Sequence, residues 1–151
     1  MAAKKVTSKK AAAKKAAPKS SKVKKSTAKK SPATKAAAPV GPYTPVVRAG
    51  DWVIVSGQLG LKDGVMAKGV AAQTAQAVVN LKARLAEAGV TINDVKKTLC
   101  FLTDMDTFAT FNEAYVAGFG KSRPARSTIG VASLPAGGQV EIEAWAYKPL
   151  R

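Results

Sequence analysis

The sequence contains no histidine and a single cysteine, Cys100. Without histidine, the chain lacks the commonest metal ligand and general base of proteins. A single cysteine cannot form an internal disulfide. These two absences exclude a zinc site built from Cys and His, a Ser-His-Asp triad and a Cys-His dyad. Any chemistry must therefore use carboxylates, Tyr, Lys, Arg, hydroxyls, the thiol or backbone groups, and we expect neither a metal nor a cofactor.

Long apolar runs are also missing. No stretch approaches the roughly 20 apolar residues that span a bilayer. Lysines interrupt every apolar stretch near the start of the sequence, so no signal-peptide core is visible there. We therefore expect a cytoplasmic protein with no membrane partner.

Acidic residues are absent from residues 1–38, which contain thirteen lysines. The remaining twelve basic residues lie in residues 39–151 together with all nine acids, so most of the net charge of +16 belongs to the first segment. A segment of Ala, Lys, Ser, Thr and Pro cannot bury enough surface to offset its chain entropy. We expect a disordered basic arm over 1–38 and one domain over 39–151.

The composition of this arm resembles the lysine-rich tails of linker histones. Its charge density favours non-specific binding to nucleic acid or another polyanion, and so an association with the nucleoid. The alternative is a solvated tail that only improves solubility. Base-specific recognition is not indicated, because the arm has neither aromatic residues nor arginine.

The order of elements expected after residue 39 is β β α β α β β. Apolar and β-branched runs predict strands at 46–47, 52–61 and 95–103, with two more after Pro124. Helical periodicity predicts helices over 70–88 and from Asp106 or Thr107 to about Phe119. Such an order predicts an α+β sandwich, a mixed sheet with both helices on one face. Its other face would stay apolar and uncovered, which indicates self-association, and we expect a trimer or another homo-oligomer.

Two opposite charges flank the turn rich in Pro and Gly at 134–138. Arg126 begins the strand before this turn, and Glu141 begins the strand after it. If the two strands are neighbours, a fixed cation and a fixed carboxylate share one cleft, which suits a small carboxylic acid whose neighbouring carbon is attacked by water. The pair is equally compatible with a surface salt bridge.

Six short motifs occur in order along residues 39–147. They are GPY at 41–43, VSGQ at 55–58, FLTDM at 101–105, FNEAY at 111–115, PARST at 124–128 and VEIEA at 140–144. Together they resemble the RidA (YjgF) family of imine and enamine deaminases. This resemblance implies a chorismate-mutase-like α+β fold and homotrimers whose ligand clefts lie between subunits.

The activity that the resemblance implies is hydrolysis of reactive 2-imino acids, such as 2-iminobutanoate and 2-iminopropanoate, to 2-oxo acids and ammonia. It assigns the catalytic positions to two residues: Arg126 would hold the substrate carboxylate, and Glu141 would position the attacking water. Four further positions would line the cleft, namely Tyr43, Ser56, Asn112 and Thr128. Thr128 stands where several members have cysteine.

Three positions depart from the family pattern. Gly60 replaces a usual proline, while Gly130 and Ser133 replace charged residues. These changes bear on substrate preference more than on the reaction. Two functions therefore stay open: a trimeric imine hydrolase, and a non-catalytic RidA-like trimer that binds nucleic acid or another ligand.

Overall fold

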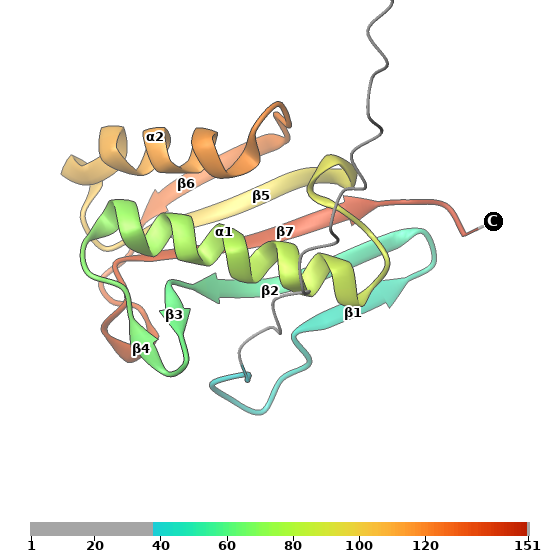
Figure 1. Cartoon of the computed structure of the whole chain (residues 1–151), viewed down its shortest axis with the longest axis horizontal. Helices are drawn as coiled ribbons and strands as arrows, with labels where there is room; N and C mark the ends of the chain where they lie inside the picture. Colours follow the sequence, from blue (N-terminus) through green and yellow to red (C-terminus); the bar gives the residue numbers. More distant parts are fainter. Residues whose placement is uncertain (1–37, 151) are drawn as a thin grey trace, which may run out of the picture. The chain divides into compact units, whose positions relative to one another are not determined.

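The structure is a computed structural model that describes residues 38–150. The expectations about residues 1–37, including disorder and nucleic-acid binding, lie outside the described residues. The described chain forms a mixed sheet with two long helices (Figure 1). Its principal elements are β1 (Val46–Ala49), β2 (Trp52–Leu59), α1 (Val70–Glu87), β5 (Val95–Leu102), α2 (Phe108–Phe119), β6 (Ala125–Gly130) and β7 (Val140–Tyr147).

These elements confirm the expected order β β α β α β β. A small hairpin, β3 (Leu61–Lys62) and β4 (Val65–Met66), turns at Asp63-Gly64, where both residues have positive φ. Short 3-10 turns occur at Ile92–Asp94, Met105–Thr107 and Pro135–Gly137. The turn before α2 is capped by Asp104, whose carboxylate accepts a hydrogen bond from the backbone N–H of Asp106.

The five long strands lie in the order β1-β2-β7-β5-β6. β7 is antiparallel to both β2 and β5, and β5 is parallel to β6. Strands β2, β5 and β6 are therefore parallel to one another. The chain crosses from β2 to β5 through α1, and then from β5 to β6 through α2, each time moving toward the same edge of the sheet. Since such crossovers are almost always right-handed, both helices lie on the same face, as the sequence predicts (Figure 1).

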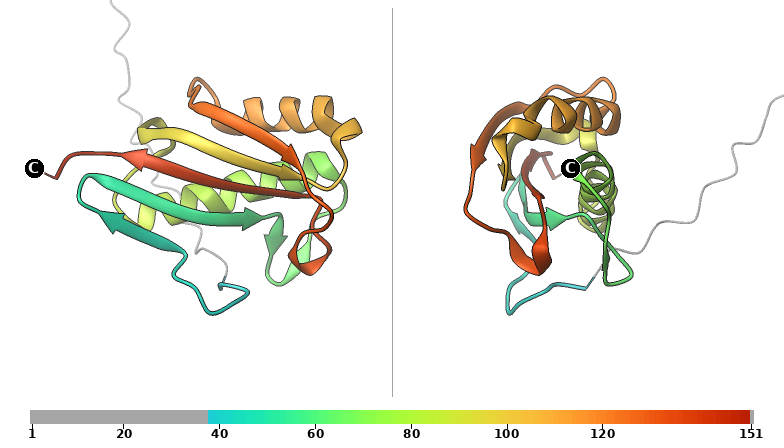
Figure 2. Two further views of the ribbon diagram at one scale, coloured as in Figure 1. Left: turned by 180° about the vertical axis from the view of Figure 1, so that it is seen from behind. Right: turned by 90° about the vertical axis from the view of Figure 1, so that its left-hand side faces the viewer.

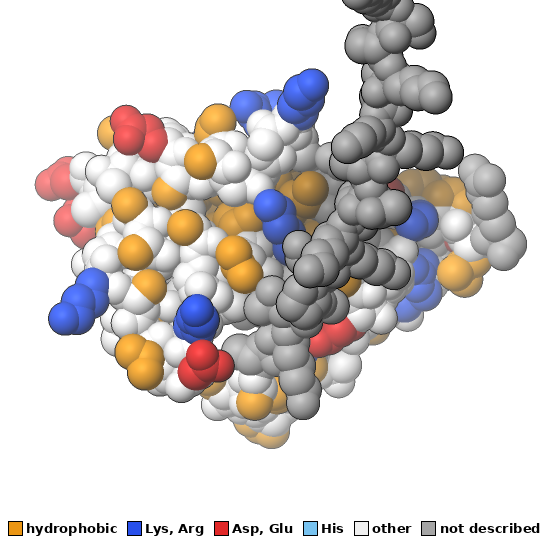
Figure 3. All heavy atoms as spheres, in the orientation of Figure 1, with side chains coloured by type: hydrophobic (Ala, Val, Ile, Leu, Met, Phe, Trp, Pro, Cys, Tyr) orange, Lys and Arg blue, Asp and Glu red, His pale blue; other side chains and the backbone are white. Residues whose placement is uncertain are grey.

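The core lies between this helical layer and the sheet. Alternate residues of the strands point into it, among them Val53 and Val55 of β2 and Ile142 of β7, each at most 1% exposed. From α1 the buried stripe includes Leu81 and Leu85, at the helical spacing that predicts the element. Seen from the helical side, apolar, basic and acidic side chains are interspersed over the surface (Figure 3).

The opposite face of the sheet has no covering layer among the described residues (Figure 2). Several large apolar side chains are at least 38% exposed there, namely Val47, Trp52, Ile54, Ile129 and Tyr147. Partly buried Leu99, Phe101 and Trp145 lie on the same side of their strands. These eight residues are called the open sheet face below. The uncovered apolar face is thus confirmed, while the trimer stays a prediction.

Candidate functional site

Arg126 projects from β6 onto the helical side of the sheet. In the register of the parallel pair it lies opposite Thr98 of β5, which is fully buried under the helices. Its Nη2 donates a hydrogen bond of 2.7 Å to Oδ1 of Asn112 on α2. The guanidinium carbon also lies over three aromatic rings of α2, those of Phe108, Phe111 and Tyr115, at 5.6, 5.4 and 4.7 Å from their centroids. The cation is therefore fixed by neutral partners.

Thr128 lies two residues beyond Arg126 on β6 and so shares its face of the strand. Its Oγ1 is shielded from solvent and has no hydrogen-bond partner among the described residues. A buried hydroxyl without a partner costs free energy, so a group that accepts or donates a hydrogen bond here would be favoured. Arg126, Asn112 and Thr128 thus form one polar cluster, called the arginine half-site.

Glu141 is the second residue of β7 and points to the opposite side of the sheet. Its sequence neighbours Val140 and Ile142 are fully buried on the helical side, whereas Glu141 itself is only partly buried. The Glu141 side chain lies against the backbone of Gly57 on β2. A Cβ at Gly57 would overlap Oε1 of Glu141 and come within 2.5 Å of its Cδ. Only glycine leaves room for the carboxylate at this position.

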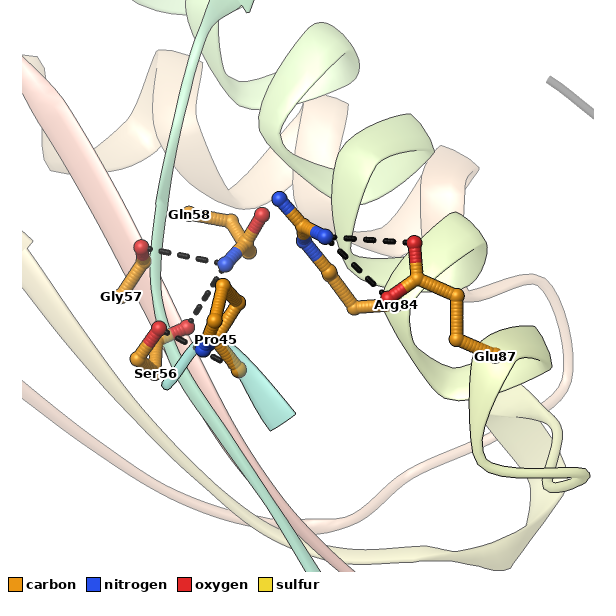
Figure 4. A network of polar contacts seen from close by, with 6 residues as sticks. All are labelled: Pro45, Ser56, Gly57, Gln58, Arg84 and Glu87. Atoms are coloured by element: carbon orange, nitrogen blue, oxygen red, sulfur yellow. Dashed lines mark hydrogen bonds and ion pairs between the residues drawn. The ribbon is translucent and has the colours of Figure 1, made fainter. Parts of the chain in front are cut away.

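A bulge in β2 creates this close approach. The pairing of β2 with β7 shifts register between Val55 and Gln58, so one extra residue lies in β2 opposite Glu143. The Gln58 side chain donates hydrogen bonds to the carbonyls of Ser56 and Gly57 at 3.0 and 3.2 Å, which stabilises the bulge (Figure 4). A glycine inside a strand often marks such a close approach of another group to the backbone, as at Gly57 here.

Tyr43, Ser56 and Glu141 line one hollow of about 230 Å³. Gly57 and the apolar side chains of Val40, Leu59 and Pro135 complete its wall. The Ser56 hydroxyl donates a hydrogen bond of 3.3 Å to the carbonyl of Pro45 (Figure 4). We call this group the glutamate half-site. It offers one carboxylate and two hydroxyls beside an apolar wall.

The environment of Glu141 makes it a better proton acceptor than an exposed carboxylate. Burial raises its pKa above the ordinary value of 4.5, and the nearby charge of Glu143 raises it further. Burial also raises the pKa of Glu143. Because a raised pKa brings a carboxylate closer to the operating pH, it improves general-base catalysis.

The two half-sites do not meet within one chain. The sequence interpretation placed the strands of Arg126 and Glu141 side by side, but β5 lies between β6 and β7. Arg126 pairs with Thr98 and Glu141 with Phe101, so their Cα atoms lie about 14 Å apart from strand spacing and rise. They also point to opposite faces of the sheet, so the two charges form neither a shared cleft nor a salt bridge in one subunit.

The three rings under Arg126 and the glycine beside Glu141 are the site features that sequence reasoning assigned incompletely. The helical spacing of Phe108, Phe111 and Tyr115 is typical of a buried stripe, and Phe111 and Tyr115 are buried, whereas Phe108 is only partly buried. The spacing does not indicate their contact with Arg126. Gly60, a departure from the family pattern, is explained by packing. A Cβ there would come within 2.6 Å of the Gln73 Cα on α1, so the end of β2 passes directly under the helix backbone.

Cys100 takes no part in either half-site. It is fully buried in β5, and burial raises the pKa of its thiol to about 11. A buried thiol with a raised pKa is unreactive. Within residues 38–150 no group of three or more His, Cys, Asp or Glu side chains is placed to hold a metal ion. No helix in this part of the chain is long and apolar enough to cross a membrane.

Comparison with known sequences gives extensive matches over the folded region. A sequence model of the family described as "Endoribonuclease L-PSP" matches residues 33–148. A RutC family protein of Pyrococcus horikoshii is 43% identical over 116 residues, covering 75% of this chain and 92% of the relative. A protein of Salmonella typhimurium named 2-iminobutanoate/2-iminopropanoate deaminase is 42% identical over 118 residues, with 75% and 92% coverage.

Solved structures also match this chain over most of its length. The crystal structure of RidA from the Antarctic bacterium Psychrobacter matches with a TM-score of 0.72 and 43% sequence identity. The match covers 75% of this chain and 94% of the Psychrobacter protein. Fold and sequence are therefore similar over nearly all of that relative.

Proposed function

The chain belongs to the RidA family, whose shared domain carries the description Endoribonuclease L-PSP, and on that premise we propose that it hydrolyses reactive 2-imino acids to 2-oxo acids and ammonia. The observation that carries the proposal is that the Arg126 side chain is fixed in position while its charge is not paired with a carboxylate among the described residues. Its guanidinium is fixed by Asn112 and aromatic rings, and no carboxylate among the described residues pairs with it. Its charge is thus available to a carboxylate ligand.

Substrate binding follows from the geometry of a guanidinium. Two parallel hydrogen bonds from Arg126 to the substrate carboxylate would fix the plane of that group, and with it the position of the adjacent C2 atom. The Thr128 hydroxyl lies in the same half-site but is shielded from solvent, so it would contact the substrate only after its side chain rotates. 2-Iminobutanoate and 2-iminopropanoate fit this requirement because each has a carboxylate next to its imine carbon.

The chemical step needs one proton acceptor and a positioned water. The imine carbon is already electrophilic, so positioning and general-base catalysis suffice for attack. Glu141 accepts a proton as the water oxygen bonds to C2 and the C=N π electrons move to nitrogen. That proton passes to nitrogen and gives a neutral carbinolamine. Transfer of the remaining hydroxyl proton to nitrogen then accompanies cleavage of the C–N bond and formation of the C=O bond, which releases ammonia and the 2-oxo acid.

A complete site requires two subunits. Because the half-sites lie on opposite faces of the sheet, Arg126, Asn112 and Thr128 of one subunit would meet Tyr43, Ser56 and Glu141 of a neighbour. The open sheet face supports this assembly, since apolar side chains of that size and exposure are normally covered. We therefore propose a homotrimer with a substrate cleft at each subunit boundary.

The test is a coupled assay in which threonine dehydratase generates 2-iminobutanoate. Adding the full-length protein should accelerate the release of 2-oxobutanoate, and Arg126→Ala should abolish the acceleration. Arg123→Ala is the matched control, because this exposed arginine donates hydrogen bonds to the carbonyls of Gly120 and Ser122 and lies in neither half-site. An unchanged rate with folded wild-type protein contradicts the proposal.

The sequence of residues 1–38 supports a second proposal, that the arm binds nucleic acid non-specifically and associates a cytoplasmic enzyme with the nucleoid. With thirteen lysines and no acid, one arm bound to duplex DNA would give a plot of log affinity against log salt concentration with a slope no steeper than roughly −12. Three arms in a trimer would add avidity. Deletion of residues 1–38 should abolish retention on DNA, and undiminished retention contradicts this role. DNA retention without imine hydrolysis would instead favour the non-catalytic scaffold.

A further inference from the structure

The guanidinium of Arg126 lies over three aromatic rings of one helix, α2. Phe108, Phe111 and Tyr115 occupy positions i, i+3 and i+7 of α2, so their rings form one stripe on the side facing β6. The guanidinium carbon lies within 5.6 Å of all three ring centroids. Asn112, on the same turn of the helix, accepts its hydrogen bond.

The nearest ring is itself held in place. The Tyr115 hydroxyl and the Thr98 hydroxyl share a hydrogen bond of 2.9 Å beneath the sheet. The Tyr115 ring stacks on Phe119 with a centroid separation of 4.1 Å and an interplanar angle of 16°. Phe111 is fully buried and Tyr115 is 4% exposed, so neither ring can move without disturbing the core. The surface under the guanidinium is therefore rigid.

The chemistry of these partners distinguishes them from an ordinary salt bridge. An Asp or Glu would fix the arginine but would also neutralise it and compete with an anionic ligand. Ring faces attract a cation through their quadrupole, and an amide oxygen accepts a hydrogen bond, and neither cancels the charge. A long, flexible side chain is thereby held in one orientation while its charge stays available, which reduces the ordering cost of binding a ligand.

From this geometry we infer that Phe108, Phe111 and Tyr115 are positioning residues that preorganise Arg126 to bind the carboxylate of the substrate. The inference rests on the proposed function for the identity of that carboxylate. It assigns these rings a role in ligand affinity in addition to their role in the core. Since they touch the arginine and not the reacting atoms, their effect should appear in KM more than in kcat.

Phe108 is the best residue to test, because it is only partly buried and lies at the edge of the core. Phe108→Leu keeps an apolar side chain of similar size and removes the ring face. We expect KM for 2-iminobutanoate to rise about three- to fivefold with kcat within about twofold of wild type. Phe108→Tyr restores a ring and should restore KM. Val116→Ala, on an exposed position of α2, is a control for general effects on the helix.

Tyr115 provides a second, graded test. Tyr115→Phe keeps the ring and loses the hydrogen bond to Thr98, whereas Tyr115→Leu also loses the ring face. The increase in KM should therefore be larger for Tyr115→Leu, about 10- to 30-fold, than for Tyr115→Phe. Melting curves of both variants identify any general loss of folding. In NMR spectra, the ring-current shift of the Arg126 Nε–H should persist in Tyr115→Phe and shrink in Tyr115→Leu.

Direct binding separates this inference from the proposed reaction. Calorimetry with 2-oxobutanoate, a stable carboxylate of the same size, measures affinity without turnover. Weaker binding by folded Phe108→Leu supports the inference even if wild-type protein shows no imine hydrolysis. Wild-type affinity in Phe108→Leu overturns the inference while the deaminase function stands. A wild-type protein that binds no carboxylate overturns both.

Discussion

Gly57 offers a direct test of whether the position of the Glu141 carboxylate matters for function. A methyl group at residue 57 would overlap Oε1 of Glu141 and lie 2.5 Å from its Cδ, whereas ordinary contact begins at 3.4 Å. In a Gly57→Ala variant the Cδ atom of Glu141 must therefore retreat by about 1 Å, and its Oε1 atom by more. A misplacement of that size in a reacting geometry costs about 10²-fold in rate.

The same substitution should leave the fold intact. The clashing atoms are the end of a flexible side chain that borders a hollow, so Glu141 can rotate away without moving the backbone. Alanine also restricts the unfolded chain, which favours folding by about 0.4–1 kcal/mol where the backbone conformation is compatible. We expect a melting temperature at or slightly above that of wild type.

The assay combines thermal unfolding with the coupled imine assay. Gly57→Ala should lower kcat by about 100-fold, equivalent to about 2.7 kcal/mol of barrier. In a Glu141→Gln background, which already lacks the proton acceptor, Gly57→Ala should cost little more, because both changes act on one group. Wild-type turnover by folded Gly57→Ala refutes the assigned role of Glu141. Additive losses in the double variant would show that Gly57 acts through something other than this carboxylate.

The half-sites and the open sheet face yield four further predictions. Arg126→Lys keeps the charge but cannot form two parallel hydrogen bonds, so kcat/KM should fall about 10- to 100-fold, and wild-type kinetics would contradict a bidentate contact. Glu143→Gln removes a charge that raises the pKa of Glu141, so the acid limb of the kcat/KM profile should move to lower pH, by less than burial contributes. For Glu141 itself, a folded pKa above the unfolded 4.5 means that ionisation destabilises the fold as pH rises through the folded value. Unfolding curves should thus show Glu141→Gln more stable than wild type at pH 7, with the difference vanishing near pH 4. Ile54→Glu puts a charge on the open sheet face and should dissociate the oligomer in light scattering, whereas an intact oligomer would place the interface elsewhere.

Local patterns in the sequence were enough to predict most of the helices and strands. The period of the α1 stripe, the turn at Asp63-Gly64 and the alternation in β7 each depend on neighbours within a few residues. The order of the strands within the sheet, by contrast, does not depend on neighbours in the sequence. The Pro- and Gly-rich turn suggested that β6 and β7 are adjacent, but β7 crosses to the middle of the sheet, because its alternating apolar side chains complete the core between β2 and β5.

The candidate site likewise has some features that the sequence indicates and others that it does not. A glycine next to Ser56 in a strand indicated a close approach of backbone, and the structure identifies the approaching group as the Glu141 carboxylate. The contact between Arg126 and the rings of α2 joins residues that are near in sequence, yet the pattern suggested only a core stripe. Periodicity reports which side of a helix is buried and not which charged group from another strand lies against it.

The central position of β7 has a consequence for how the protein is made. It follows every other strand along the chain, yet it separates β2 from β5, and Tyr147 pairs with Trp52, 95 residues earlier. During synthesis β1 and β2 can pair with each other, but the other edge of β2 stays unpaired until Val140–Tyr147 emerges from the ribosome. Such long-range closure slows folding and exposes two strand edges that could pair with other nascent chains. Nonsense or frameshift changes before Val140 should therefore produce aggregation rather than a smaller folded domain, and cells should depend on chaperones most during this last step.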